Sequence, residues 1–246
     1  MSAPVELMRV HNLRMSYADK VVLSDIDLSI FEGDVICLIG SSGSGKSTLL
    51  RCLNLLETID DGSIFFDGTE ISDPLVDARR VRQEIGMVFQ AYNLFPHLSV
   101  LDNCTLAPVR VHGVARAEAK ALAMELLTRF GLAEHATKHP DALSGGQQQR
   151  AALVRALCTK PRLLLLDEIT AALDPELVGS VLEIVRAEAA AGMTMILATH
   201  EMAFARDVAT SVCFLHDGRI LEQGPPEQIF TAPREARTRT FLSRVL

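Results

Sequence analysis

The sequence predicts an α/β fold in which a sheet is buried on both faces and helices pack against it. The first observation is a set of short apolar runs, each long enough for one strand. They comprise residues 35–39 before Gly40, residues 163–166 before Asp167 and residues 193–198 before Thr199. The second is that segments with helical spacing separate these runs. The third is the length of 246 residues, which suits one compact domain with a lobe inserted into it.

Two helical segments fall within residues 92–160. One carries Leu122, Leu126 and Phe130 at four-residue spacing, and the other is expected to run from about Gln147 to Cys158. No convincing strand lies in this part of the sequence. We therefore expect residues from about 92 to 160 to form a helical lobe inserted into the α/β core.

A further helix is expected after Asp174. Asp174 suits the N-cap and Pro175 suits the first turn, and Leu177, Val181 and Val185 form one apolar stripe. Such a stripe is typical of a helix that packs one face against a core.

The composition excludes several classes of function. Lys and Arg number 24 against 31 Asp and Glu, for a formal charge of −7, and there is no Trp. Proteins that bind nucleic-acid phosphates are usually basic, so we expect no nucleic-acid partner. The five scattered cysteines indicate neither a disulfide framework nor a zinc site and fit a reducing cytosol. No apolar run reaches the length of a membrane span and the start lacks a secretory signal, so we expect the chain to stay on one side of the membrane.

Residues 40–47 match the full spacing of a phosphate-binding P-loop, G-x-x-x-x-G-K-S, between a predicted strand and a helix-like segment. The expected phosphate-binding residues are Gly40, Ser41, Ser42, Gly43, Ser44, Gly45, Lys46, Ser47 and Thr48. The backbone N–H groups would cradle phosphate, Lys46 would reach the β- and γ-phosphates of a nucleotide, and Ser47 would bind magnesium. The alternative, a plain Gly- and Ser-rich turn, gives no reason for Lys46 and Ser47 at these places.

Polar residues stand where predicted strands end. Asp167 and Glu168 follow the apolar run 163–166, at the edge where ligands collect in open α/β sheets. We predict that Asp167 holds the magnesium shell and that Glu168 orients and deprotonates the attacking water. Gln90 would complete the metal shell or position water, and His200 would contact the γ-phosphate. The alternative for each is an ordinary solvated strand end.

A second anion-binding helix start is predicted about a hundred residues after the P-loop. Ser144, Gly145, Gly146 and Gln147 open the helix expected there, without a lysine. Because helical structure intervenes, we expect the two sites to meet when two copies of the chain pack head to tail, each P-loop capped by the partner's second site. The alternative is that Ser144 is only an N-cap beside a flexible glycine pair.

In order and spacing these motifs resemble the ATPases of ATP-binding cassette (ABC) transporters, over nearly the whole chain. The resemblance implies a P-loop (RecA-like) core with an N-terminal antiparallel β subdomain and an inserted α-helical subdomain, within residues 5–240, that binds ATP and Mg²⁺. It also implies an adenine-stacking aromatic at Tyr17, a D-loop at residues 171–174 that brings Asp174 to the nucleotide, and a switch histidine at His200. Taken alone, Tyr17 would be a half-buried strand aromatic and Asp174 a helix N-cap.

Residues 88–98, 199–202 and 237–242 further resemble the polar amino acid uptake subfamily. Two positions depart from its pattern. Tyr92 replaces the usual Phe, which we expect to be benign, and Ile169 replaces a proline that is common there. Without that proline the backbone has a free N–H and the turn is less rigid, but no catalytic group is lost.

The resemblance implies an ATP-driven import subunit at the cytoplasmic face of the cell membrane. Its partners would be transmembrane permease subunits and, through them, a periplasmic or extracellular solute-binding protein. Residues 91–107 are the candidate groove for a permease helix, the alternative being apolar packing of the lobe. Two other functions stay open: a membrane complex for export or cell division, and a cassette acting on DNA or ribosomes. Polar amino acids are the favoured cargo, with a compatible solute such as ectoine as the alternative.

Overall fold

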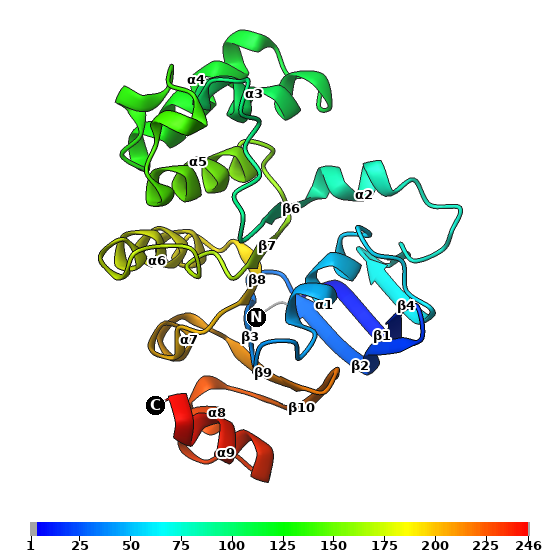
Figure 1. Cartoon of the computed structure of the whole chain (residues 1–246). Helices are drawn as coiled ribbons and strands as arrows, with labels where there is room; N and C mark the ends of the chain where they lie inside the picture. The colour runs from blue at the N-terminus through cyan, green and yellow to red at the C-terminus, as the bar shows by residue number, and fades with distance from the viewer. Residues whose placement is uncertain (1–3, 246) are drawn as a thin grey trace.

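The computed structural model of the chain describes residues 4–245 (Figure 1). Its central sheet has six strands in the order β10-β9-β3-β8-β7-β6, and every neighbouring pair is parallel except β9 and β10. The strands are β3 (Val35–Ile39), β6 (Ile85–Val88), β7 (Leu163–Asp167), β8 (Thr194–Ala198), β9 (Ser211–His216) and β10 (Arg219–Gly224). The three predicted strands are thus confirmed at the centre of the sheet, although β8 starts one residue later than predicted.

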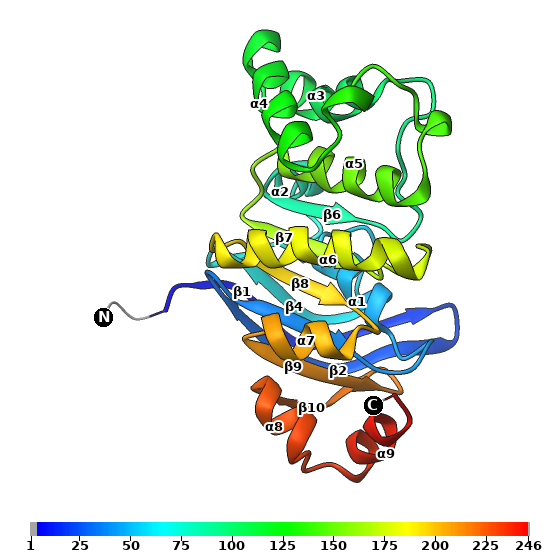
Figure 2. The same ribbon diagram turned by 90° about the vertical axis from the view of Figure 1, so that its left-hand side faces the viewer.

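Both faces of this sheet are buried, as the apolar runs predict. The helices that follow its strands are α1 (Lys46–Leu53), α6 (Pro175–Ala190), α7 (Met202–Val208), α8 (Pro226–Thr231) and α9 (Ala236–Val245). Along β3, Val35, Cys37 and Ile39 belong to the core that includes α6, whereas Ile36 and Leu38 belong to the core that includes α1. Figure 2 shows α6 lying across one face of the sheet.

A four-stranded antiparallel sheet, in the order β2-β1-β4-β5, packs on the α1 side of the core (Figure 1). Its strands are β1 (Glu6–Tyr17), β2 (Lys20–Phe31), β4 (Asp61–Phe66) and β5 (Thr69–Glu70). Buried and exposed residues alternate along much of β1 and β2, because one face of this sheet packs on the core and the other meets solvent. The expected N-terminal antiparallel subdomain is therefore present.

The elements between β6 and β7 are helical and form the lobe at the top of Figure 1. They are α3 (Val100–Arg110), α4 (Arg116–Arg129), the 3₁₀ turns Ala133–His135 and Pro140–Ala142, and α5 (Gly145–Leu157), while α2 (Ala78–Glu84) precedes β6. The helix expected from about Gln147 to Cys158 is present as α5, which begins two residues earlier, at Gly145, and ends at Leu157. Ser144 and Gln147 form a reciprocal capping box that lets the helix start at Gly145. The limits of the domain and of the lobe, residues 5–240 and 92–160, remain predictions.

None of the helices in residues 4–245 combines the length and the hydrophobicity needed to cross a bilayer.

Candidate active site

The P-loop joins the end of β3 to the start of α1. Gly40 has a φ of 150°, and a Cβ at this residue would lie 2.2 Å from the carbonyl oxygen of Leu215 on β9, so a side chain has no room here. Lys46 opens α1 and is only 4% exposed. Its Nζ donates to the carbonyl oxygens of Gly40 and Ser41 at 3.0 and 3.2 Å. The ammonium group is thereby held against the loop.

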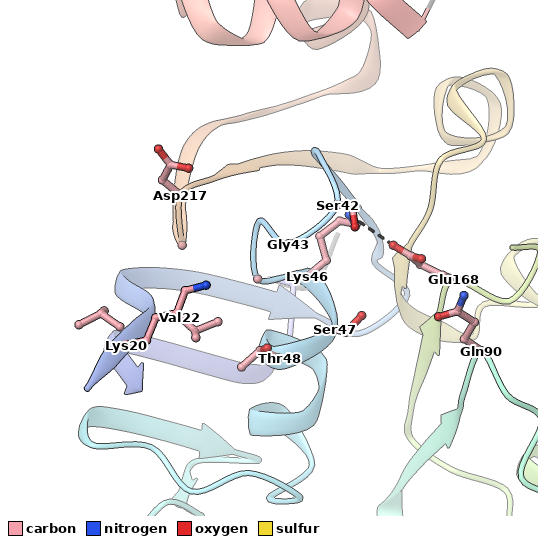
Figure 3. Close-up of a pocket in the computed structure, with 13 residues that line it drawn as sticks. Lys20, Val22, Ser42, Gly43, Lys46, Ser47, Thr48, Gln90, Glu168 and Asp217 are labelled. Carbon is pink, nitrogen blue, oxygen red and sulfur yellow. Dashed lines mark ion pairs between the residues drawn. The ribbon is translucent and has the colours of Figure 1, made fainter. Parts of the chain in front are cut away.

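The P-loop forms one wall of a cavity of about 600 Å³ (Figure 3). The predicted site residues that line it are Ser42, Gly43, Gly45, Lys46, Ser47, Thr48, Gln90 and Glu168. Its volume is in the range of small-molecule sites. The P-loop, Gln90 from the segment after β6 and Glu168 from the end of β7 therefore meet at one site.

Oxygen atoms suited to magnesium lie beside the P-loop. Ser47 Oγ donates to Asp167 Oδ1 at 2.6 Å, and Gln90 lines the same cavity as Ser47. Burial raises the pKa of Asp167 above its ordinary value, the Ser47 hydrogen bond opposes this, and the Glu168 carboxylate adds to it. Hydroxyl, amide and carboxylate oxygens are the ligands that magnesium prefers, so these residues fit the ion. Across residues 4–245, no cluster of three or more His, Cys, Asp or Glu side chains is placed to hold a metal.

Glu168 projects into the cavity from a strained turn at the end of β7. Its φ of 46° lies in the left-handed region, and its N–H donates to the Ala198 carbonyl oxygen at 3.0 Å. Glu168 Oε1 lies 3.4 Å from Lys46 Nζ, the ion pair drawn in Figure 3, and 3.0 Å from His200 Nε2. Ile169, which follows it, is buried. The carboxylate is thus placed where it could accept a proton from a water molecule in the cavity.

A second cavity, of about 390 Å³, adjoins the first at Glu168. His200 and the D-loop residues Ala171 and Leu173 line it. Asp174 occupies the N-cap position of α6, but its side chain makes no capping hydrogen bond. The Asp174 carboxylate therefore makes no hydrogen bond to the first turn of its own helix.

The signature residues 144–147 lie at the start of α5 and line neither of these two cavities. Ser144 is the N-cap of α5, as the alternative interpretation has it. This does not exclude anion binding, because both interpretations use the N-terminus of the same helix. A Cβ on Gly146 would lie 3.0 Å from Leu177 Cδ1, so this glycine also lets α5 approach α6 closely.

Tyr17 is the last residue of β1 and is 43% exposed. Its hydroxyl donates to Glu57 Oε1 at 2.8 Å, and its pKa is raised by burial and then by this bond. Tyr17 does not line the first cavity, but its hydroxyl also interacts with Thr48, which does. Tyr17 is therefore next to a residue of the cavity wall without lining the cavity itself.

Five lining residues are absent from the sequence-based prediction: Lys20, Val21, Val22, Asp217 and Gly218 (Figure 3). The first three begin β2, and the other two form the turn between β9 and β10. A Cβ on Gly218, whose φ is 75°, would lie 2.3 Å from the carbonyl oxygen of Val22, so this turn packs directly on β2. The Asp-Gly pair is a local signal for a turn but says nothing about its distant contact.

Known proteins are similar to this chain in sequence. The sequence profile of the ABC transporter family matches residues 23–171. The chain is 50% identical over 236 residues to the glutamine transport ATP-binding protein GlnQ of Geobacillus stearothermophilus, covering 96% of this chain and 98% of that protein. This chain belongs to the ABC transporter family. The cassette is also 47% identical over 245 residues to the general L-amino acid transport ATP-binding protein AapP of Rhizobium johnstonii, covering 100% of this chain and 95% of the relative.

Solved structures of other cassettes have the same fold. The dimeric post-hydrolysis state of the ATP-binding cassette MJ0796, bound to ADP and Pi, matches with a TM-score of 0.80 at 29% identity, covering 89% of this chain and 99% of that chain. CbiO1 from Clostridium perfringens, part of the ABC transporter complex cbiONQ, matches with a TM-score of 0.82 at 29% identity, covering 98% and 97%. The cassette is an ATP-hydrolysing subunit, and cassettes of this family dimerise and work with membrane permease subunits.

Proposed function

We propose that this cassette hydrolyses ATP to drive the uptake of polar amino acids through separate permease subunits at the cytoplasmic face of the cell membrane. The observation that carries the proposal is that the P-loop, Gln90 and Glu168 line the same cavity. The cargo is supported by relatives that match over nearly their full length and are named for the transport of glutamine, general L-amino acids, or glutamate, glutamine, aspartate and asparagine.

ATP would place its phosphates in the P-loop with its adenine against the ring of Tyr17. Lys46 would then exchange its contacts with the Gly40 and Ser41 carbonyl oxygens and with Glu168 for phosphate oxygens. This exchange frees Glu168 to orient a water molecule and to accept its proton. His200, already 3.0 Å from that carboxylate, would keep it in place and contact the γ-phosphate.

Ser47, Gln90 and Asp167 would hold Mg²⁺ beside the phosphates. When bound, the ion would neutralise the charge that develops on the phosphate oxygens. Asp167 is kept in position for this by the hydrogen bond from Ser47. Gln90 would link the metal to the loop that follows it, which leads into the helical lobe.

A second copy of the chain would complete the site. The P-loop cavity is not lined by residues 144–147 or by Asp174 of its own chain. A head-to-tail dimer would bring these residues against the nucleotide of the partner. The dimeric state of MJ0796 supports this arrangement for a related cassette. Binding of ATP would join the two copies, and hydrolysis with phosphate release would separate them.

Residues 91–107 would receive a helix of the permease. This segment follows Gln90 directly and exposes apolar side chains, among them Phe95, 43% exposed, and Leu106, 36% exposed. Opening and closing of the dimer would thus be transmitted from Gln90 to the membrane subunits. A periplasmic or extracellular solute-binding protein would deliver the cargo on the other side.

The test is copurification of the cassette with its membrane subunits, followed by ATPase measurements with a loaded solute-binding protein. Stimulation by a binding protein that carries a polar amino acid is the expected result. Stimulation only by one that carries ectoine or another compatible solute would correct the cargo. Full activity without any binding protein would favour the alternative, a membrane complex for export or cell division.

A further inference from the structure

The loop after Gln90 contains two consecutive non-glycine residues in the left-handed region, Tyr92 with a φ of 59° and Asn93 with a φ of 52°. Each carries a conformational cost that contacts must offset. Arg155 on α5 supplies such contacts: its guanidinium donates to the carbonyl oxygen of Tyr92 at 3.1 Å and also to that of Asn93. The helix α5, which begins with the signature residues 144–147, therefore holds this loop in its conformation through Arg155.

The side chain of Tyr92 reaches a third segment. Its hydroxyl donates to the carbonyl oxygen of Ala172, 3.2 Å away in the D-loop. A Cβ on Gly145, the first residue of α5, would lie 3.1 Å from the same hydroxyl, so the start of α5 also lies against it. Burial and then the charge of Asp174 raise the pKa of Tyr92. Like any tyrosine hydroxyl, it is protonated at neutral pH and can donate.

These contacts bring together three segments with separate parts in the proposed function. The loop after Gln90 begins the segment 91–107 proposed to receive the permease helix, α5 begins with the signature residues 144–147, and the D-loop follows Glu168. The helices α5 and α6, which start at the last two of these segments, lie one above the other in both views of the molecule (Figures 1 and 2). The Tyr92 hydroxyl connects them at a place where a phenylalanine would have no partner for the Ala172 carbonyl oxygen.

We propose that Tyr92 is a positioning residue for the nucleotide-dependent dimer, whose hydroxyl ties the loop after Gln90 to the D-loop beside the signature. The inference rests on the proposed function. A movement of the loop after Gln90 would thereby displace the D-loop and the start of α5 in the same chain. Tyr92 acts through the Ala172 backbone and not on the reacting atoms.

The variant Tyr92→Phe removes only the hydroxyl and keeps the ring. In a Glu168→Gln background, the dissociation constant of the ATP-bound dimer, measured by analytical ultracentrifugation, should rise roughly threefold to tenfold. Without the hydrogen bond the D-loop is less ordered in the single chain and has to be ordered when the dimer forms, which costs about as much as one neutral hydrogen bond contributes. The ATP affinity of the monomer, measured with Ser144→Arg added, should not change. Thr128→Val is the matched control, because it removes a hydroxyl whose 2.7 Å bond to the Met124 carbonyl oxygen lies within α4.

Hydrogen exchange of the nucleotide-free chain tests the hydrogen bond between Tyr92 and Ala172 without any dimer. The N–H groups of Ala171 and Leu173 donate to the carbonyl oxygens of Glu168 and Thr170 at 3.0 and 3.1 Å. Their exchange should be roughly threefold to tenfold faster in Tyr92→Phe and unchanged in the Thr128 control.

Equal D-loop exchange in the two variants would overturn the proposal. So would a loss of monomer ATP affinity as large as the change in the dimer constant, because Tyr92 would then have a general structural role. A Glu168→Gln chain with Tyr92 intact that fails to dimerise with ATP would refute the proposed dimer, while the exchange rates would still decide whether the Tyr92 hydrogen bond holds the D-loop.

Discussion

The replacement Glu168→Gln removes one charge from the cavity and changes the side-chain volume little. In the structure, Glu168 Oε1 lies 3.4 Å from Lys46 Nζ and 3.0 Å from His200 Nε2. At 3.4 Å two unit charges attract by about 5 kcal/mol with an effective dielectric constant of about 20, and desolvation of the pair offsets most of this. Because the γ-phosphate competes with Glu168 for Lys46, ATP affinity should stay the same or tighten by up to about tenfold.

Hydrolysis should respond in the opposite direction. A glutamine cannot accept the proton of the attacking water, so kcat should fall roughly 10²- to 10⁴-fold, or about 3–5 kcal/mol of transition-state stabilisation. Phosphate release and calorimetric ATP binding, on the same preparation, measure the two effects. Glu32→Gln is the matched control, because Glu32 pairs with Arg162 near the amino ends of β3 and β7, whereas Glu168 follows the carboxyl end of β7. Hydrolysis by Glu168→Gln at the wild-type rate would refute the assignment of Glu168 as the base.

Three other substitutions test the signature, the P-loop turn and the magnesium ligand Asp167. Ser144→Arg should abolish turnover but leave nucleotide binding by the single chain intact in a fluorescence titration, and lost binding by the monomer would show that the signature acts within its own chain. Gly40→Ala should destabilise the fold by roughly 1–3 kcal/mol and weaken ATP binding, because its Cβ would meet the Leu215 carbonyl oxygen at 2.2 Å, whereas unchanged thermal unfolding would contradict this. Asp167→Asn should abolish magnesium-dependent hydrolysis yet raise the free energy of unfolding at pH 7. Burial raises the pKa of Asp167, so its ionised form destabilises the folded chain, and the advantage of Asn should shrink as the pH falls toward the ordinary carboxyl pKa of about 4. Denaturant unfolding at pH 7 and at about pH 5 measures this, and an equal difference at both values would count against it.

Much of the site could be predicted because its chemistry depends on residues that are adjacent in the sequence. The P-loop joins β3 to α1 within eight residues, and the polar residues after β6 and β7 follow apolar runs directly. Parallel strands bring their carboxyl ends to one edge, so Gln90 and Glu168 reach the same cavity although 78 positions separate them.

The remaining features depend on contacts that leave no local pattern. The wall formed by Val22 and Gly218 requires the antiparallel sheet to pack on the β9–β10 turn, which no short motif encodes. The left-handed φ of Glu168 is set by its surroundings, because a glutamate has no intrinsic preference for that region. From the sequence alone, Tyr92 looks equivalent to a Phe, because its hydrogen bond to Ala172 joins residues 80 positions apart.

The central claim is that ATP lies between two copies of the chain, held by Lys46 of one and capped by Ser144 of the other. Light scattering of the Glu168→Gln protein saturated with ATP and Mg²⁺ measures this most directly. The expected result is the mass of two chains, and the mass of one chain once Ser144→Arg is added. The mass of a single chain with ATP bound to Glu168→Gln would contradict it.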